Sequence, residues 1–381
     1  MRRIRLAVVA PSLAYLGGQA VQAQRLLTCW RGDPDVDAWL VPHDPPPPRL
    51  LGFAKRIKFV RTAVNQATYL PLLVSELQRA DVVHVFSASY SSFLLAPLPA
   101  IQIARVLGKP VVLNYRSGEA SDHLSRSAIA RRAIARVDRN VVPSKYLVDV
   151  FAAFGIEATI VPNVVDLSRF RFSERQPLRP RLLSTRNFDG LYNVACTLRA
   201  FRIVQDRYPD ASLTLVGGGP NESRLRALAG DLGLAGLVFA GRVAPDRIHE
   251  QYASHDIYLQ SPDIDNMPAS VIEAFASGLP VVSTRAGGIP AILTDGVHGL
   301  LAPLDDHRML ASHVCTLLEQ PRYASSLARA ARDTCVRYEW SAVRQQWLDV
   351  YASLLPARSS APSSAPDRLR PVGLLTGTPP K

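Results

Sequence analysis

The chain has 381 residues, which is enough for two domains of about 150–200 residues each. Hydrophobic residues make up 48% of it and charged residues 20%, a balance that is typical of a soluble globular protein and excludes a largely disordered one. The formal net charge of +12 comes mainly from residues 1–165, with 20 Lys and Arg against 11 Asp and Glu, and it predicts an anionic partner: a membrane surface, a nucleic acid or a phosphorylated substrate.

Cysteine and histidine usage gives no sign of a metal site. The cysteines Cys29, Cys196, Cys315 and Cys335 are far apart and form no CxxC pair, so we expect free thiols in a reducing compartment, the cytoplasm. The eight histidines show no HExxH or comparable ligand spacing. We therefore predict no metal held by the protein.

The N-terminus, MRRIRLAVVAPSLAYLGG, has two interpretations. Three arginines before an apolar stretch imitate a signal peptide, but IRLAVVAP also fits the first buried strand of an α/β fold. Since Pro11 and Ser12 cut the apolar run short, we favour the strand. The next apolar stretch, SFLLAPLPAIQIARVLG, contains Pro97, Pro99 and Arg105, so no membrane span is predicted.

Short apolar strand candidates alternate with helical patterns along the whole chain. Several are runs of β-branched residues that end in small or polar ones, as expected for parallel strands buried on both faces and ending at a ligand-binding edge. The pattern predicts an α/β fold with two doubly wound domains. The strand candidates are IRLAVVAP, DVVHVFS, KPVVLNY and RNVVPS in the first half, and RLLSTR, SLTLVGGGP, LVFAGRV, DIYLQS and LPVVST in the second.

The domain junction is expected in IVPNVVDLSRFRFSERQPLRP, a proline-bracketed polar stretch without helical period. We therefore predict one domain over residues 1–165 and a second over 166–337. A final helix is predicted within 338–355, because WSAVRQQWLDVYASLL places apolar residues at helical spacing. The Ser/Pro-rich tail, 356–381, is predicted to be disordered.

Two carboxylates, Asp265 and Glu273, lie eight residues apart in SPDIDNMPASVIEAFASGLPVVST. Pro268 suits the start of a helix, and free backbone N–H groups there would attract an anion such as a diphosphate. From the local sequence, Asp265 either caps this helix or contacts a ligand. Glu273 has no cation at helical spacing, so it needs solvent, a ligand hydroxyl or, alternatively, an arginine elsewhere in the chain.

The stretch resembles the acid–x7–acid signature of retaining glycosyltransferases with the GT-B fold, in particular family four. Other segments resemble that family in the same order, and together they cover nearly the whole folded chain. The resemblance implies two facing Rossmann-like domains, an N-terminal one for the acceptor and a C-terminal one for the nucleotide-sugar, with the final helix crossing back to the first domain. The segments are LGGQAVQAQRLL, VPNVVDLSRF, LLSTRNF, LTLVGGGP, VFAGRV and AGGIPAILTDGVHGLLAP.

The resemblance also implies roles for individual residues. Glu273 would accept the ribose hydroxyls of the donor, Asp265 would face the donor sugar, and Arg186 would neutralise the leaving diphosphate. Arg116 is the residue closest to the position of the family's N-domain histidine, and we count it among the catalytic candidates. The remaining donor-binding candidates are Gly17 and Gly18 in the glycine loop, Asn266, Ala269 and Ser270 around the start of the helix, and Arg242 in VFAGRV.

The sequence departs from the family pattern at four places. Aspartate stands at 265 where glutamate is usual, and the lysine expected shortly after Arg186 is replaced within the segment GLYNV. Arg116 replaces the histidine, and Ala291 lies where glutamate is common. Without the lysine, neutralisation of the phosphates should be weaker, since charge-assisted hydrogen bonds are worth roughly 1.5–3 kcal/mol each.

The expected function is transfer of a sugar, with retention and without a metal or other cofactor, from a nucleotide diphosphate-sugar to a hydroxyl acceptor. The acceptor would be lipid-linked or a growing polysaccharide. The alternative is a non-catalytic GT-B protein that acts as a binding partner in glycan assembly, or an enzyme with an unusual donor. An NAD-dependent oxidoreductase is disfavoured, because LVGGGP does not fit the GxGxxG spacing.

A basic segment, residues 49–61, reads RLLGFAKRIKFVR. Lys55, Arg56, Lys58 and Arg61 alternate with large apolar residues, which suits a helix lying on an anionic membrane. A solvated helix face above a core-facing stripe gives the same pattern, so both interpretations stay open. Nucleic acid is not expected, since no recognition motif accompanies the charge. The expected location is the cytoplasm, with peripheral binding at the inner membrane face as the alternative.

Overall fold

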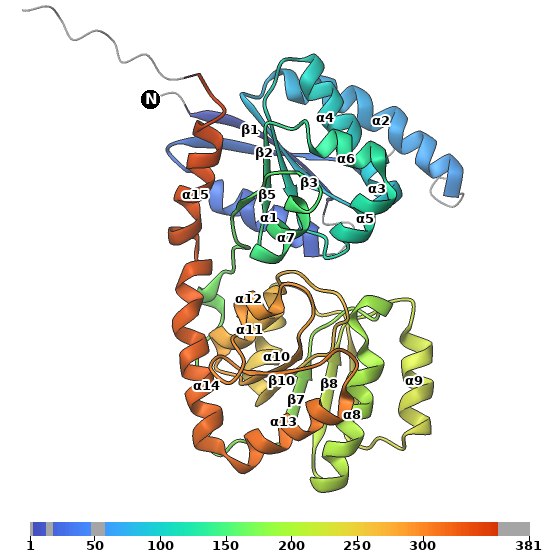
Figure 1. Cartoon of the computed structure of the whole chain (residues 1–381), viewed down its shortest axis with the longest axis vertical. Helices are drawn as coiled ribbons and strands as arrows, with labels where there is room; N and C mark the ends of the chain where they lie inside the picture. The colour runs from blue at the N-terminus through green and yellow to red at the C-terminus, as the bar shows by residue number, and fades with distance from the viewer. Residues whose placement is uncertain (1–2, 13–17, 47–57, 357–381) are drawn as a thin grey trace, which may run out of the picture.

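The computed structural model describes residues 3–12, 18–46 and 58–356, and it shows two α/β halves stacked along the long axis of the molecule (Figure 1). The first half contains a six-stranded parallel sheet in the order β2-β1-β3-β4-β5-β6. Its strands are β1 (Ile4–Ala10), β2 (Val36–Pro42), β3 (Val82–Ser87), β4 (Val111–Tyr115), β5 (Arg139–Val142) and β6 (Thr159–Ile160). Its helices are α1 (Gly18–Trp30), α2 (Lys58–Gln78), α3 (Tyr90–Leu95), α4 (Pro97–Val106), α5 (Ala120–Arg126), α6 (Ala128–Ile134) and α7 (Lys145–Ala152).

The second half repeats this architecture with the sheet order β12-β11-β10-β7-β8-β9, again all parallel. Its strands are β7 (Arg181–Ser184), β8 (Ser212–Val216), β9 (Leu237–Gly241), β10 (Ile257–Leu259), β11 (Val281–Thr284) and β12 (Leu300–Ala302). Its helices are α8 (Val194–Arg207), α9 (Glu222–Asp231), α10 (Ile248–Ser254), α11 (Ala269–Ser277), α12 (Ile289–Ile292), α13 (His307–Glu319) and α14 (Pro321–Thr334). The prediction of two doubly wound α/β units is confirmed.

All nine strand candidates form strands, and Ile4–Ala10 forms β1 inside the first sheet, as the strand interpretation of the N-terminus requires. Three strands of the described residues were not predicted: β2, β6 and β12. Each lies at a sheet edge, and β2 is interrupted by polar and half-buried residues while β6 and β12 have two and three residues. Edge strands carry a weaker apolar signal, because they have a neighbour on one side only.

The topology determines where a ligand can bind. In each sheet the strand order reverses at a switch point, between β1 and β3 in the first sheet and between β7 and β10 in the second. In open α/β sheets, ligands bind outside the carboxyl ends of the strands at such a point. The segments after β4, β7 and β10 contain Arg116, Arg186 and Asp265. Arg186 and Asp265 therefore follow the two strands that flank the second switch point, and Arg116 follows a strand one place away from the first.

The final helix, α15 (Trp340–Ala352), crosses back to the first half, as predicted (Figure 1). Its buried residues Val343, Trp347, Val350 and Tyr351 share a core cluster with residues of β1, β3 and α1. Arg344 adds an ion pair with Asp33, at 2.7 Å. The last element of the chain therefore completes the core of the first domain.

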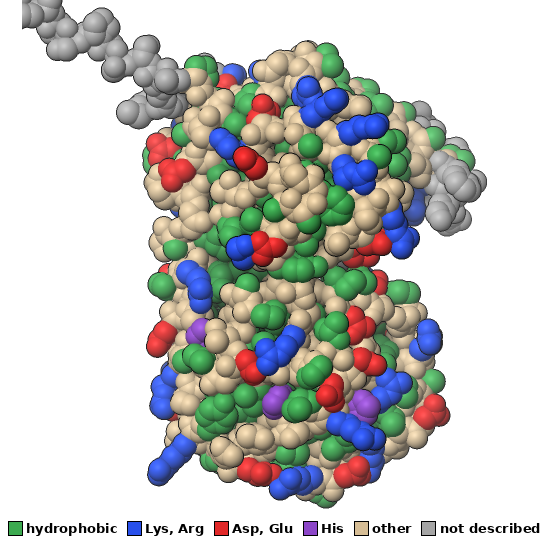
Figure 2. Space-filling view, viewed as in Figure 1, with side chains coloured by type: hydrophobic (Ala, Val, Ile, Leu, Met, Phe, Trp, Pro, Cys, Tyr) green, Lys and Arg blue, Asp and Glu red, His purple; other side chains and the backbone are tan. Residues whose placement is uncertain are grey.

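The predicted domain boundaries stay a prediction, although β6 and β7 lie on either side of residue 165. Residues 49–57 of the basic segment and all of the tail after Pro356 lie outside the described residues. Among the described helices, none is long and apolar enough to cross a membrane. On the face shown in Figure 2, Lys and Arg are interspersed with Asp and Glu over both halves.

Candidate active site

A pocket of about 490 Å³ lies between the two halves, at the carboxyl ends of both sheets. Nine of the ten predicted site residues line it, and the tenth, Gly17, lies outside the described residues. Residues that are up to 255 positions apart in the sequence are thus brought together in one cavity. The nine are Gly18, Arg116, Arg186, Arg242, Asp265, Asn266, Ala269, Ser270 and Glu273.

The loop between β10 and α11 presents the first carboxylate. Helix α11 begins at Ala269, its N-cap is Pro268, and no side chain caps it. The helix-cap interpretation of Asp265 is therefore wrong, because this side chain makes its contacts elsewhere. The glycine pair of AGGIPA sets the path of the loop: a Cβ at Gly287 would lie 2.0 Å from the carbonyl oxygen of Asp265.

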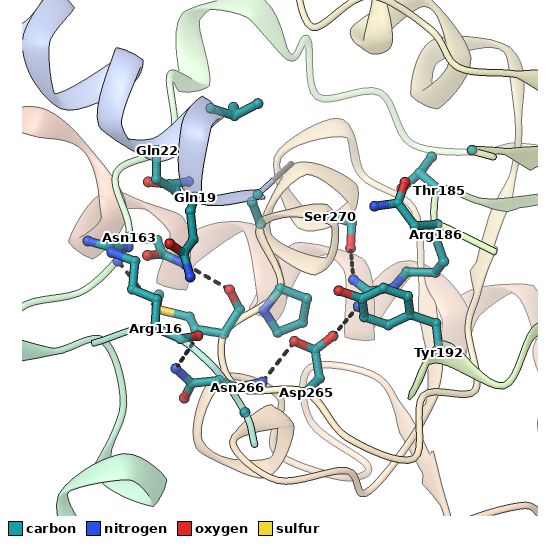
Figure 3. Close-up of a pocket in the computed structure, with 18 of the residues that line it drawn as sticks. Gln19, Gln22, Arg116, Asn163, Thr185, Arg186, Tyr192, Asp265, Asn266 and Ser270 are labelled. Carbon is teal, nitrogen blue, oxygen red and sulfur yellow. Dashed lines mark hydrogen bonds and ion pairs between the residues drawn. The ribbon is translucent and has the colours of Figure 1, made fainter. Parts of the chain in front are cut away.

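Asp265 forms an ion pair with Arg186, which follows β7 (Figure 3). The other oxygen of the Asp265 carboxylate accepts a 2.8 Å hydrogen bond from the backbone N–H of Asn266. Arg186 donates to the hydroxyl of Ser270 at 3.2 Å, and only 9% of its side chain is exposed. Burial opposes the charge of Arg186, but the Asp265 carboxylate more than offsets it and raises the pKa of the guanidinium. Arg186 is therefore a permanent cation at the floor of the pocket.

Tyr192 stands in the segment that lacks the family's lysine. Its ring lies 4.0 Å from the guanidinium carbon of Arg186 (Figure 3), a cation–π contact that is favourable where water is excluded. The segment thus supports the arginine by packing and adds no second positive charge. The other cations that line the pocket are Arg25, Arg116 and Arg242.

Glu273 is paired, and its partner comes from the opposite half. One carboxylate oxygen accepts from Arg25 on α1 at 2.8 Å, and the other accepts from the Tyr252 hydroxyl at 3.0 Å. The side chains of Arg25 and Glu273 are 18% and 9% exposed. Burial, reinforced by Glu273, keeps the pKa of Tyr252 well above its ordinary value, so the phenol remains a donor. The interpretation in which Glu273 pairs with an arginine from elsewhere in the chain is therefore confirmed, and this arginine also lines the pocket.

Arg116 lies at the N-terminal side of the pocket, after β4. Its Nε donates to Asn114 Oδ1 at 2.9 Å, and its guanidinium carbon lies 5.3 Å from the ring centre of Phe86. Its buried Nη1 has no hydrogen-bond partner among the described residues. Burial lowers the pKa of Arg116 to about 9, so the side chain is still a cation at neutral pH.

Asn266 connects the two halves. Its amide oxygen accepts from the Ser144 hydroxyl, and its amide nitrogen approaches the carbonyl oxygen of Arg116 at 3.5 Å (Figure 3). Asn163, in the linker, donates to the carbonyl oxygen of Met267 at 2.8 Å. Asn266 thus forms contacts between the two halves and also lines the pocket.

Among the pocket residues that were not predicted from the sequence are Arg25, Tyr192 and Asn163. Tyr252, which donates to Glu273 from behind the pocket lining, was not predicted either. Arg25 lies one helical turn after Gln22, which is buried on the inner face of α1, but nothing in the sequence marks either residue as part of a site. Tyr192 and Tyr252 sit in segments with no distinguishing pattern. Among the described residues, no group of three or more His, Cys, Asp or Glu side chains could hold a metal ion.

Comparison with known proteins assigns the chain to a family. The profile described as Glycosyltransferase Family 4 matches residues 16–169, and the one described as Glycosyl transferases group 1 matches residues 179–320. The chain is 30% identical over 307 residues to the GDP-mannose-dependent alpha-(1-6)-phosphatidylinositol monomannoside mannosyltransferase of Mycolicibacterium smegmatis, covering 73% of this chain and 77% of the relative. It is 26% identical over 380 residues to sulfoquinovosyl transferase SQD2 of Arabidopsis thaliana, covering 90% and 71%.

The fold has solved counterparts. Anabaena HepE in complex with UDP and glucose superimposes with a TM-score of 0.74, at 17% identity over 92% of this chain and 100% of HepE. The sucrose-phosphate synthase of Thermosynechococcus elongatus gives a TM-score of 0.72, at 17% identity over 92% and 99%. The sequence matches and the two facing α/β sheets lead to one conclusion: the chain belongs to the group 1 glycosyltransferases of family 4, with the GT-B fold.

Proposed function

We propose that this glycosyltransferase moves a sugar from a nucleoside diphosphate donor to a hydroxyl acceptor with retention of anomeric configuration. The single observation that carries the proposal is the pocket between the two sheets, where the acid pair, Arg186 and the start of α11 converge. Its charged lining comprises four arginines and three carboxylates. With two arginine–carboxylate pairs formed, the remaining cations, Arg116 and Arg242, favour a ligand with a negatively charged centre.

Donor binding exchanges internal contacts for ligand contacts. The ribose hydroxyls would donate to Glu273, in competition with Arg25 and Tyr252. The diphosphate would lie against the uncapped first turn of α11 and between Arg186 and Arg116. Asp265, released from Arg186, would accept a hydrogen bond from a hydroxyl of the donor sugar. Each carboxylate keeps a polar partner before and after binding, so the exchange leaves neither acid buried without a hydrogen-bond donor.

The arginines supply the main catalytic effect in this proposal. When the anomeric C–O bond breaks, positive charge develops on the sugar ring and negative charge on the departing diphosphate. Arg186, fixed by Ser270 and Tyr192, stabilises that negative charge from a preorganised position. Retention follows if the acceptor attacks on the face that the diphosphate leaves, with a phosphate oxygen taking the proton of the acceptor hydroxyl. The reaction as proposed uses no metal and no other cofactor.

We extend the proposal to a lipid-linked acceptor at the inner membrane face. The name of the Mycolicibacterium relative specifies a phosphatidylinositol monomannoside as its acceptor, and the excess of Lys and Arg in residues 1–165 suits an anionic surface. Flotation with anionic liposomes tests this part. Binding that falls at high salt, and that falls on replacing Lys55, Arg56 and Lys58 by Gln, would support it, whereas flotation unchanged by either would contradict it.

Nucleotide binding tests the proposed donor site. Thermal shift with UDP, GDP and ADP and their sugars should show stabilisation by one nucleotide family, reduced in Glu273→Gln. A Glu319→Gln variant is the matched control, because Glu319 pairs with Arg207 on the surface of the C-terminal domain. Binding without any turnover would favour the non-catalytic alternative, and no binding by the whole panel would contradict the proposal.

A further inference from the structure

The C-terminal helix places a hydroxyl group deep in the N-terminal domain. Tyr351 on α15 is fully buried, and its hydroxyl lies 2.8 Å from Nδ1 of His84 on β3. His84 is also fully buried. Its ring stacks on Phe86 with centroids 5.0 Å apart and contacts Trp347 at 4.7 Å. The histidine is therefore held between the sheet and the crossing helix.

The hydrogen-bonded chain continues from this histidine to the pocket. His84 Nε2 lies 2.9 Å from the side-chain nitrogen of Asn114 on the neighbouring strand β4. The side-chain oxygen of Asn114 accepts from Arg116 Nε at 2.9 Å. The series Tyr351, His84, Asn114, Arg116 thus joins the last helix of the chain to a cation that lines the pocket.

Which atom donates in each hydrogen bond of this series follows from Arg116, at the pocket end. The Arg116 Nε–H can only donate, so the amide oxygen of Asn114 faces it and the amide N–H group faces His84. His84 Nε2 must then accept, which leaves the proton on Nδ1 and makes the Tyr351 oxygen its acceptor. Burial, with Arg116 nearby, lowers the pKa of His84 to about 3, so the ring is neutral at physiological pH. A neutral histidine with the proton on Nδ1 gives each of the three contacts in the series one donor and one acceptor.

From this arrangement we infer that Tyr351, His84 and Asn114 are positioning residues that aim Arg116 at the donor diphosphate. The inference rests on the proposed function, and it deepens the role given there to Arg116. If the Tyr351 hydroxyl is lost, His84 Nδ1–H loses its acceptor and the ring is free to carry its proton on Nε2. The amide of Asn114 then has to turn, and an N–H group replaces the oxygen that holds Arg116 Nε.

Tyr351→Phe tests the inference, because it removes one oxygen and keeps the ring. We expect kcat to fall about tenfold with the KM for the donor little changed. The reason is that the turn of Asn114 removes the hydrogen bond that holds the charged Arg116 in place for the transition state. Tyr69→Phe is the matched control: Tyr69 is also fully buried in the N-terminal domain and donates one hydrogen bond, at 3.0 Å to the carbonyl oxygen of Ala96, away from the pocket. Equal kinetics of the two variants would overturn the inference.

A double-mutant cycle distinguishes an effect of Tyr351 on the position of Arg116 from a general loss of stability. In an Arg116→Lys background the Nε–H that binds Asn114 is absent, so adding Tyr351→Phe should lower kcat no further. A second tenfold loss in that background would mean that Tyr351 acts through stability alone and would overturn the inference.

The protonation state of His84 can be read without any substrate. Long-range ¹H–¹⁵N correlation spectra of histidine-labelled protein at neutral pH should show His84, assigned by its loss in His84→Gln, with the proton on Nδ1. A proton on Nε2 in the wild-type protein overturns the inference. A wild-type protein that binds no nucleotide contradicts the proposed function, whereas nucleotide turnover unaffected by Tyr351→Phe overturns this inference alone.

Discussion

The two sides of the pocket are built differently. On the C-terminal side, Asp265, Ser270 and Glu273 come from one short stretch, and Arg186 follows the adjacent strand. On the N-terminal side, Arg25 and Arg116 come from separate elements, and Arg116 is held by a chain that starts on the last helix. One side is a local motif, and the other is assembled from distant parts of the sequence.

This difference suggests a division of tasks. The C-terminal side carries both acids, and in the proposed reaction it recognises the nucleotide and neutralises the diphosphate through Arg186. The N-terminal side contributes cations, one paired across the cleft with Glu273 and one with a buried, unpaired Nη1 among the described residues. Closure of the two halves brings both sets within reach of one ligand. Substitutions on the two sides should therefore change different properties of the protein.

The largest effect is expected for Arg186→Ala. Removing this cation leaves the diphosphate charge unstabilised and Asp265 without its partner, so kcat should fall about 10²- to 10³-fold. Initial rates of nucleoside diphosphate release measure it. Arg285→Ala is the control, because Arg285 forms an ion pair with Asp295 on the surface and does not line the pocket. Equal rates for both variants would remove Arg186 from the mechanism.

Asp265→Asn should lower kcat by about 10- to 100-fold, the value of one charge-assisted hydrogen bond to the sugar. Its affinity for the nucleoside diphosphate alone should not fall, because Arg186 is no longer engaged by a carboxylate. Calorimetry on the variant, alongside steady-state rates, checks both statements. A variant with weaker diphosphate binding and normal turnover would place Asp265 at the nucleotide and away from the sugar.

Glu273→Gln should act on binding. We expect the nucleotide Kd to rise about tenfold, because an amide accepts ribose hydroxyl bonds less strongly than a carboxylate, while kcat at saturating donor changes little. The same titration with Glu319→Gln should match wild type. If kcat falls and Kd stays constant, Glu273 does not bind the ribose.

Arg25→Met should have the smallest effect on turnover, within about threefold, since in the proposed donor complex Glu273 has exchanged Arg25 for the ribose hydroxyls. Its signature should be structural: without the Arg25–Glu273 bond between the halves, the ligand-free protein should open. Small-angle X-ray scattering should give a larger radius of gyration for the variant, and nucleotide should reduce the difference. Identical scattering of variant and wild type would show that this pair does not hold the halves closed.

The sequence predicted the local side of the site and most of the fold. Asp265 and Glu273 could be recognised because both lie within one loop and the helix that follows it, and inner strands such as β1 carry apolar runs. Arg25 and Tyr351 could not, because their roles depend on how α1 and α15 pack across 248 and 267 residues of sequence. Three of the four edge strands, β2, β6 and β12, were missed for a related reason, since a strand with a neighbour on one side only has a weaker apolar pattern.

The central claim is that this pocket transfers a sugar from a nucleotide donor. Its most direct test is release of nucleoside diphosphate from a panel of UDP-, GDP- and ADP-sugars by the wild-type protein and by Arg186→Ala. We expect the wild-type protein to release nucleoside diphosphate from at least one donor, and Arg186→Ala to do so about 10²- to 10³-fold more slowly. Release at the same rate by both proteins, or neither binding nor release with any donor, would contradict it.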